Sequence, residues 1–107
     1  MAGRTRRIID YADRTVRLTG ERLVHIHEHP EMVGQERRIR EVLQKPDVVF
    51  SSHKDSSVHV YYRHYARSPV GPKHLMVAVK ILKEDAFVIT AFFTDDVKGG
   101  EEIWPRK

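Results

Sequence analysis

Residues 75–93 read LMVAVKILKEDAFVITAFF and contain two runs in which apolar residues recur at every second position. In the first run these positions extend from Leu75 to Ile81, and in the second they include Phe87, Ile89 and Ala91. A period of two is typical of β-strands that pack one face against a core. The polar residues 83–85 between the runs predict a short turn, so we expect the two strands to be antiparallel neighbours.

The chain before these strands contains two more strand-like segments and a helical region. Residues 48–50 are apolar, and residues 58–63 alternate again, with Val58 and Val60 assigned to the core face. A short alternating strand also fits residues 14–19. We therefore predict an α+β fold in which N-terminal helices within residues 20–45 pack on one face of a four-stranded antiparallel sheet within residues 47–95.

Local signals divide the helical region into two helices. Thr19 is a suitable N-cap, and Glu21 follows it in the first turn, where negative charge is favourable. Pro30 disfavours a helical conformation at the residue before it and fits the first position of a new helix. We expect a first helix that ends near His29 and a second helix that begins at Pro30 and stops before Pro46.

The composition is that of one small domain with a modest positive charge. The 107 residues include 19 Lys and Arg against 15 Asp and Glu, which gives a net charge of +4. We expect a basic tail or edge element at residues 1–13 and a single domain at residues 14–107. The absence of cysteine excludes disulfides, thiolate metal sites and cysteine nucleophiles. No apolar run approaches the roughly 20 residues that span a bilayer, so we expect a cytoplasmic protein without a membrane partner.

Residues 22–31, RLVHIHEHPE, carry three histidines next to an arginine. If residues 21–29 are helical, Arg22, His25 and His29 share one narrow arc of the helix surface, because residues three and four apart are neighbours there. A guanidinium beside two imidazoles suits anion binding and proton transfer near neutral pH. This segment therefore indicates phosphodiester chemistry, although a half-buried helical histidine with only a packing role has the same pattern.

The predicted strand parity also gives the sheet a second face. We expect that face, which is turned away from the helices, to carry His59, Tyr61, Arg63, Lys80, Thr90 and Phe92. Rings interleaved with cations are typical of surfaces that bind single-stranded RNA, where bases stack and phosphates form ion pairs. The alternative is an ordinary solvated sheet face.

Several motifs run through the chain in a recognisable order. They are Arg22-Leu23-x-His25-Ile26, His29-Pro30-Glu31, Pro46-Asp47-Val48-Val49, Tyr61-Tyr62-Arg63, Val77-Ala78-Val79-Lys80, Val88-Ile89-Thr90-Ala91, Lys98-Gly99-Gly100 and Ile103-Trp104. This order, over residues 14–104, resembles the small RNase-like domains of the barnase–EndoU–colicin–RelE group, with the closest likeness to its phage-associated branch. The resemblance implies a metal-independent endoribonuclease without a cofactor, in this group often the toxin of a toxin–antitoxin pair. The implied partners are RNA, free or on the ribosome, and an acidic antitoxin or immunity protein.

RNA carries its own nucleophile, the 2′-hydroxyl, so the enzyme must supply a base, an acid and contacts to the phosphate. We assign His25 and His29 as the acid/base candidates and Arg22 as a phosphate contact. Thr90 completes the candidate catalytic set as a hydrogen-bond donor, and we expect Tyr61, Arg63 and Lys80 to bind the strand. The chain departs from the family at Phe92-Phe93, where tyrosine is common, so a tyrosine hydroxyl that assists catalysis in relatives is missing here.

Two other functions fit the same residues. If residues 25–29 formed a strand, His25, His27 and His29 would share a face and could hold a metal ion, although the sequence offers no distant further ligand. The second alternative is a non-catalytic module that uses the basic sheet face to bind RNA or an acidic protein, because a fold does not determine a function.

Overall fold

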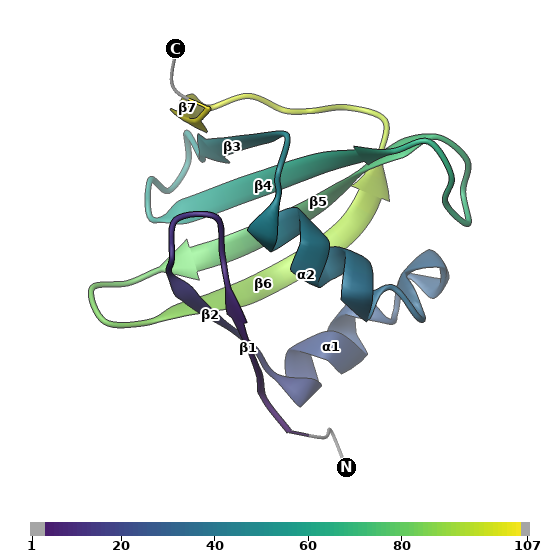
Figure 1. Cartoon of the computed structure of the whole chain (residues 1–107), viewed down its shortest axis with the longest axis horizontal. Helices are drawn as coiled ribbons and strands as arrows, with labels where there is room; N and C mark the ends of the chain where they lie inside the picture. Colours follow the sequence, from purple (N-terminus) through teal and green to yellow (C-terminus); the bar gives the residue numbers. More distant parts are fainter. Residues whose placement is uncertain (1–3, 106–107) are drawn as a thin grey trace.

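The computed structural model describes residues 4–105 and shows one twisted sheet with helices on one face (Figure 1). The strands are β1 (Arg6–Ile9), β2 (Thr15–Leu18), β3 (Val48–Ser51), β4 (Val58–Tyr65), β5 (Lys73–Ile81), β6 (Ala86–Thr94) and β7 (Glu101–Trp104). The helices are α1 (Gly20–Ile26), the short 3₁₀ helix η1 (Pro30–Met32) and α2 (Glu36–Gln44). None of these helices is long and apolar enough to cross a membrane.

The sheet has seven strands in the order β1-β2-β6-β5-β4-β3-β7. Strands β3 to β6 form the predicted antiparallel meander at its centre. Strands β1 and β2 extend it at one edge, β7 extends it at the other, and β2 runs parallel to β6, which it meets at Arg17 and Phe87. The prediction of a four-stranded antiparallel sheet is therefore wrong, since the sheet is larger and mixed.

The N-terminal residues belong to the sheet and reach the core. Strand β1 is an edge strand, and its Ile8 side chain is only 1% exposed. The turn into β2 is held by the buried carboxylate of Asp10, which accepts hydrogen bonds from the backbone N–H groups of Ala12 and Arg14, each at 2.9 Å. Within this turn Asp13 has a positive φ of 62°, a conformation that Asp tolerates better than most residues. For residues 1–13 we expected either a basic tail or an edge element, and residues 6–9 form an edge strand.

The helical region has the predicted start but different internal boundaries. The Thr19 side chain accepts a hydrogen bond from the backbone N–H of Arg22 and caps α1, as predicted. However, α1 ends at Ile26, and His29 is extended with φ −86° and ψ 106°, as expected for a residue before proline. Pro30 begins η1 rather than α2, and α2 begins only at Glu36, after the positive φ of Gly34.

The main core lies between the helices and the sheet. Helix α1 contacts β6, whereas α2 contacts β5, β1 and β4. The core side chains from the helical layer are Leu23, Ile26, Met32, Ile39, Val42 and Leu43. The opposite sheet face, which we call the open face, carries a second, smaller apolar cluster around Tyr62, Met76 and Ala78.

Strand β4 has the opposite parity to the one predicted. Tyr61 lies opposite Val77 and is fully buried in the main core, whereas Val60 lies opposite Ala78 on the open face. The assignment of Val58 and Val60 to the core face is therefore wrong. The open face has its own apolar cluster, so both faces of β4 carry apolar residues. The alternation alone therefore could not show which face of β4 packs against the helices.

Strand β5 has the predicted parity, and β6 has it only in part. The register shifts at a bulge, because Ala78 lies opposite Thr90 whereas Val79 lies opposite Val88, which leaves Ile89 as the extra residue. Ile89 consequently packs with the open-face cluster, and its predicted place in the core is wrong. Beyond the bulge, Ala91 is buried as predicted.

Candidate nucleic-acid interface

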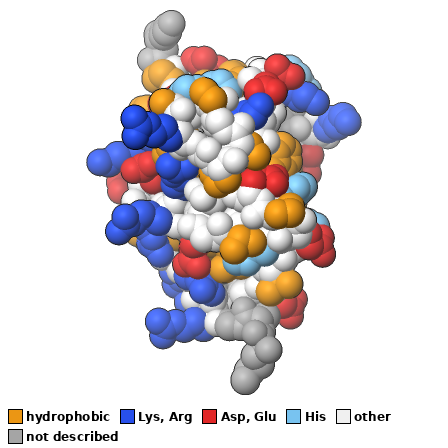
Figure 2. All heavy atoms as spheres, turned by 90° about the vertical axis from the view of Figure 1, so that its right-hand side faces the viewer, with side chains coloured by type: hydrophobic (Ala, Val, Ile, Leu, Met, Phe, Trp, Pro, Cys, Tyr) orange, Lys and Arg blue, Asp and Glu red, His pale blue; other side chains and the backbone are white. Residues whose placement is uncertain are grey.

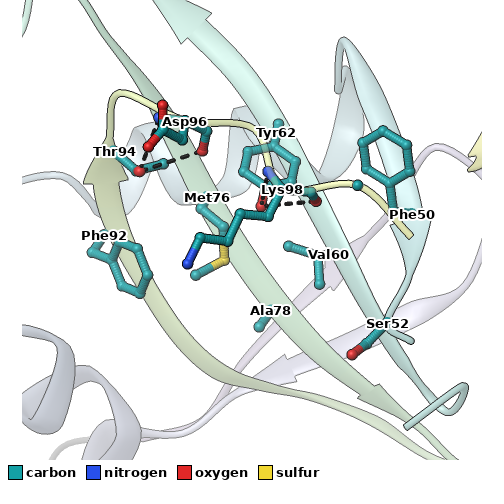
Figure 3. Close-up of a pocket in the computed structure, with 11 residues that line it drawn as sticks. Phe50, Ser52, Val60, Tyr62, Met76, Ala78, Phe92, Thr94, Asp96 and Lys98 are labelled. Carbon is teal, nitrogen blue, oxygen red and sulfur yellow. Dashed lines mark hydrogen bonds between the residues drawn. The ribbon is translucent and has the colours of Figure 1, made fainter. Parts of the chain in front are cut away.

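The open face contains a pocket of about 290 Å³ over β4, β5 and β6 (Figure 3). Its lining residues are Phe50, Ser52, Val60, Tyr62, Met76, Ala78, Phe92, Thr94, Asp96, Lys98 and Gly99. Aromatic rings stand around an apolar floor, and hydroxyl, carboxylate and amino groups lie toward the rim. The rings of Phe50 and Tyr62 meet edge to face, with 6.3 Å between their centroids. Such a pocket suits a flat ring that carries polar groups at its edge.

The segment after β6 crosses this pocket and brings Lys98 to it. The backbone N–H of Lys98 donates to the hydroxyl of Tyr62 at 3.3 Å, and that hydroxyl lies 3.5 Å from the Lys98 carbonyl oxygen, to which it donates. Burial raises the pKa of Tyr62, so its hydroxyl stays protonated at neutral pH. Figure 3 shows the Lys98 side chain extending toward Met76 and Phe92. The pocket therefore has one cation at its mouth.

His29 reaches the rim of this pocket from the helical layer. Its imidazole packs against the ring of Phe92, with 5.8 Å between the ring centroids. This contact is possible because β2 meets β6 only at Phe87, which leaves the later part of β6 without a strand neighbour on that side within residues 4–105. The His29 contact thus joins two features predicted separately, the histidine segment and the aromatic sheet face.

Each candidate imidazole has a carboxylate beside its Nδ1 atom. His25 Nδ1 lies 3.4 Å from Glu28 Oε1, and His29 Nδ1 lies 3.9 Å from Glu31 Oε1. Both rings are about half exposed, at 48% and 47% of their side-chain area. A partner at Nδ1 orients an imidazole and leaves its Nε2 atom for proton transfer.

The single helical arc predicted for Arg22, His25 and His29 does not form. Arg22 and His25 belong to α1, but the helix ends at Ile26 and His29 precedes η1. The structure places His29 against Phe92 of β6, whereas His25 is an exposed residue of α1. The i,i+4 spacing in the sequence therefore does not bring the two imidazoles onto one surface.

The remaining predicted contacts divide between the two faces of the sheet. Thr90 and Lys80 lie on the open face, opposite Ala78 and Val58. Lys80 forms an ion pair with Asp55 at 2.7 Å, and this pair together with hydrogen bonds from Ser57 lowers the pKa of the Asp55 carboxyl to about 2. Thr90 lies next to the pocket, because it pairs with Ala78, which is part of the pocket lining. Lys80 is paired with Asp55 near the C-terminal end of β5.

Tyr61 and Arg63 do not lie on the open face, and neither does His59, which lies opposite the core residue Val79; that expectation is wrong for all three. Tyr61 is fully buried, and its hydroxyl donates to the carboxylate of Asp10 at 2.6 Å. Arg63 turns toward α2, where its Nη1 donates to the Lys45 carbonyl at 2.7 Å and its Nε lies 3.5 Å from Glu41. A buried ring cannot stack on a base, so Tyr61 is a structural residue and Tyr62 takes its place at the pocket.

Sequence reasoning missed Tyr62, Met76 and the segment that carries Lys98. The sequence does not show which of the adjacent Tyr61 and Tyr62 points into the main core and which lies on the other face. Met76 is apolar and has no feature that indicates a binding site. The Lys98-Gly99-Gly100 turn was recognised only as part of a family resemblance. Its position over the sheet depends on the pairing of β7 with β3, which no local pattern predicts.

The metal alternative finds no support in the geometry. Residues 20–26 are helical, so His25, His27 and His29 do not form a strand that shares one face. Within residues 4–105 no three His, Cys, Asp or Glu side chains are grouped so as to hold a metal ion.

Comparisons of this chain with protein-family models, with curated proteins and with solved structures gave no match.

Proposed function

We propose that this chain binds single-stranded RNA on the open face of its sheet and cleaves it without a metal ion. The observation that carries the proposal is the contact between His29 and Phe92, because it places a titratable imidazole beside the aromatic pocket. A base that occupies the pocket would leave its adjoining phosphodiester at the rim. His29 is positioned to act on a phosphate there.

The pocket has the chemistry that single-stranded RNA requires. Unpaired bases bind proteins by stacking on aromatic rings, and Phe50, Tyr62 and Phe92 supply such rings. The hydroxyls of Tyr62 and Thr94 can read the polar edge of a base. Lys98 can form an ion pair with a phosphate next to the bound base.

The proposed reaction needs two proton transfers. One imidazole takes the proton of the 2′-hydroxyl, whose oxygen attacks phosphorus, and the bond from phosphorus to the 5′-oxygen breaks. A second, protonated imidazole gives its proton to that leaving oxygen, so the products end in a 2′,3′-cyclic phosphate and a 5′-hydroxyl. We assign these roles to His25 and His29, with Arg22 and Thr90 as supporting contacts. Each proton transfer contributes about 10²- to 10⁴-fold in rate.

The same proposal includes the cellular setting that the family resemblance implies. We propose that the substrate is cytoplasmic RNA, free or on the ribosome, and that the chain acts as a toxin. An acidic antitoxin or immunity protein that covers Lys98 and His29 would then inhibit it, because it would block the pocket and its rim.

RNA binding without cleavage is the second candidate function. It is favoured by the end of α1 at Ile26, which places His25 and His29 in different elements instead of on one arc. An enzyme of this kind needs both imidazoles within reach of one phosphate. The two candidates share the binding surface and differ only in the chemistry at its rim.

A cleavage assay in EDTA separates the two. Untagged protein is incubated with mixed-sequence single-stranded RNA, and the product ends are analysed for 2′,3′-cyclic phosphate. We expect cleavage by the wild type and a loss of about 100-fold or more in rate for His29→Ala. The His29 side chain is 47% exposed, so its removal should leave the thermal midpoint almost unchanged. His53→Ala, at an exposed histidine in the turn before β4, is the matched control and should cleave normally.

The assay has clear contrary outcomes. Cleavage that EDTA abolishes would contradict the metal-independent mechanism. If free RNA is not cut, the same variants are expressed in cells to test cleavage on the ribosome. Wild-type protein that neither cuts RNA nor slows growth more than His29→Ala would leave RNA binding without cleavage as the function.

A further inference from the structure

A second pocket, of about 370 Å³, lies on the helical side where the start of α2 faces the turn between β4 and β5. We call it the arginine pocket; it is lined by Gly34, Gln35, Arg37, Arg38, Arg67, Ser68 and Pro69. Three guanidinium groups contribute to it, and none of its lining residues is acidic. Figure 2 views this end of the molecule and shows Lys and Arg side chains gathered on the left, which is the side of the helices.

The carboxylates closest in sequence to these arginines are engaged elsewhere. Glu36 forms an ion pair with Arg6 at 2.9 Å, and Glu41 accepts a hydrogen bond from Tyr65 and lies 3.5 Å from Arg63. Within residues 4–105, no carboxylate pairs with a guanidinium of the arginine pocket. Among the described residues, no direct ion pair therefore neutralises the arginine pocket.

The orientation of Arg38 is fixed by its neighbours. Its guanidinium lies over the ring of Tyr65, 4.5 Å from the ring centroid. The Nη1 atom of Arg38 is buried and has no hydrogen-bond partner among the described residues. An unpaired buried donor with a positive charge is costly, and a bound anion is the partner that would relieve that cost. The Gln35 side chain does not cap α2, so the positive end of the helix dipole adds to the same charge.

In sequence, the arginine pocket begins only a few residues after His29, which lies at the rim of the open-face pocket. His29, which contacts Phe92, and Gly34, which lines the arginine pocket, are five residues apart in sequence and are joined through η1. Five residues span at most about 18 Å even when fully extended. A single strand that leaves the aromatic pocket over Phe92 and His29 and then follows η1 would reach the arginines.

We propose that the arginine pocket binds phosphate groups of the RNA strand whose base occupies the open-face pocket; this inference rests on the proposed function. The planar guanidinium matches two phosphate oxygens at once, and three such groups in one pocket suit a chain of phosphates. The lining has no aromatic anchor of the kind that peptide ligands use, which favours a phosphodiester backbone over an acidic peptide. The site sets the path of the strand rather than its sequence specificity.

The test uses two double variants that remove the same charge. One is Arg37→Gln with Arg67→Gln; the control is Arg7→Gln with Lys83→Gln, at exposed positions that do not line the arginine pocket. Affinity for a short 2′-O-methyl RNA, which cannot be cleaved, is measured by fluorescence anisotropy over a range of salt concentrations. We expect the first variant to bind about tenfold more weakly at low salt. Its plot of log affinity against log salt should be shallower by about 1.4, which corresponds to two lost phosphate contacts on a single strand.

Each outcome identifies which claim fails. If both double variants bind equally well while Phe92→Leu binds weakly, the arginine pocket is not a phosphate site and the proposed function stands. Wild-type protein that does not bind RNA at all would overturn the proposed function and this inference with it. If poly-glutamate binds more tightly than RNA and loses affinity in the Arg37 and Arg67 variant, the partner is an acidic protein and the RNA assignment is wrong.

Discussion

The imidazole of His29 lies against the ring of Phe92 with 5.8 Å between centroids, although the two residues come from opposite layers of the fold. His29 immediately precedes η1 in the helical layer, whereas Phe92 lies opposite Met76 on the open face. The two side chains meet beside the part of β6 that does not pair with β2. It is the point at which candidate acid/base chemistry meets the candidate binding surface.

Phe92→Leu should weaken RNA binding because it removes a stacking ring and the support of His29. Base stacking on an aromatic side chain contributes about 1–3 kcal/mol, so we expect a loss of affinity of about 5- to 150-fold. Phe92→Tyr keeps the ring and should bind nearly as the wild type. Anisotropy with non-cleavable RNA measures both variants, and equal affinity of the Leu and Tyr variants would show that Phe92 does not stack on a base.

Tyr61→Phe should destabilise the fold without affecting RNA binding. The Tyr61 hydroxyl donates to the buried Asp10 carboxylate at 2.6 Å, and its removal leaves that carboxylate short of one partner. We expect the free energy of unfolding to fall by about 1–3 kcal/mol, measured by urea denaturation. Tyr62→Phe is the control, since its hydroxyl makes only longer bonds to the Lys98 backbone. A larger loss for Tyr62→Phe would contradict the assigned roles.

Gly100→Ala should loosen β7 and the segment that carries Lys98. A Cβ atom at Gly100 would lie only 2.0 Å from the backbone oxygen of Ser51 in β3, so β3 and the segment that leads into β7 must move apart. We expect a loss of about 1–3 kcal/mol in the free energy of unfolding, together with weaker RNA binding. A Cβ at Gly99 would meet nothing within 4 Å, so Gly99→Ala should be nearly neutral. Similar denaturation curves for the two variants would show that the close approach is not needed.

His59 should make the protein less stable as the pH falls. Its pKa is lowered by burial and, to a smaller extent, by the charge of Arg14, with Asp10 acting in the opposite direction. The unfolded chain then binds a proton at a higher pH than the folded chain, so stability is lost as the pH falls from about 6.5 toward the lowered folded value. His59→Gln should flatten this decrease in urea midpoint, whereas His53→Gln should not. Parallel pH profiles of the wild type and His59→Gln would refute the assignment.

The part of the fold that was predictable depends on neighbouring residues in sequence. The Thr19 cap and the turn between β5 and β6 are set by adjacent side chains, and both lie where the sequence predicted them. The pairing of β2 with β6 and of β7 with β3 joins segments far apart in the chain, and no local pattern encodes it. Four-residue strands also give too few alternations to establish a partner.

The candidate site was predictable in its residue types and only partly in its geometry. Open-face positions of Lys80, Thr90 and Phe92 follow from the alternation in β5 and the later part of β6. The parity of β4 was not predictable, because Val58 and Val60 cover the apolar open face instead of the core. His29 was singled out for a helical arc, whereas its real neighbour, Phe92, is set by the way the chain passes around β6.

The most direct measurement is chemical-shift mapping of isotope-labelled protein titrated with a short, non-cleavable 2′-O-methyl RNA. If the open face is the binding surface, the largest changes should occur at Tyr62, Phe92, Thr94 and Lys98, together with the ring signals of His29. Changes confined to residues outside the open-face pocket, with the signals of Phe92 and His29 unmoved, would contradict the account.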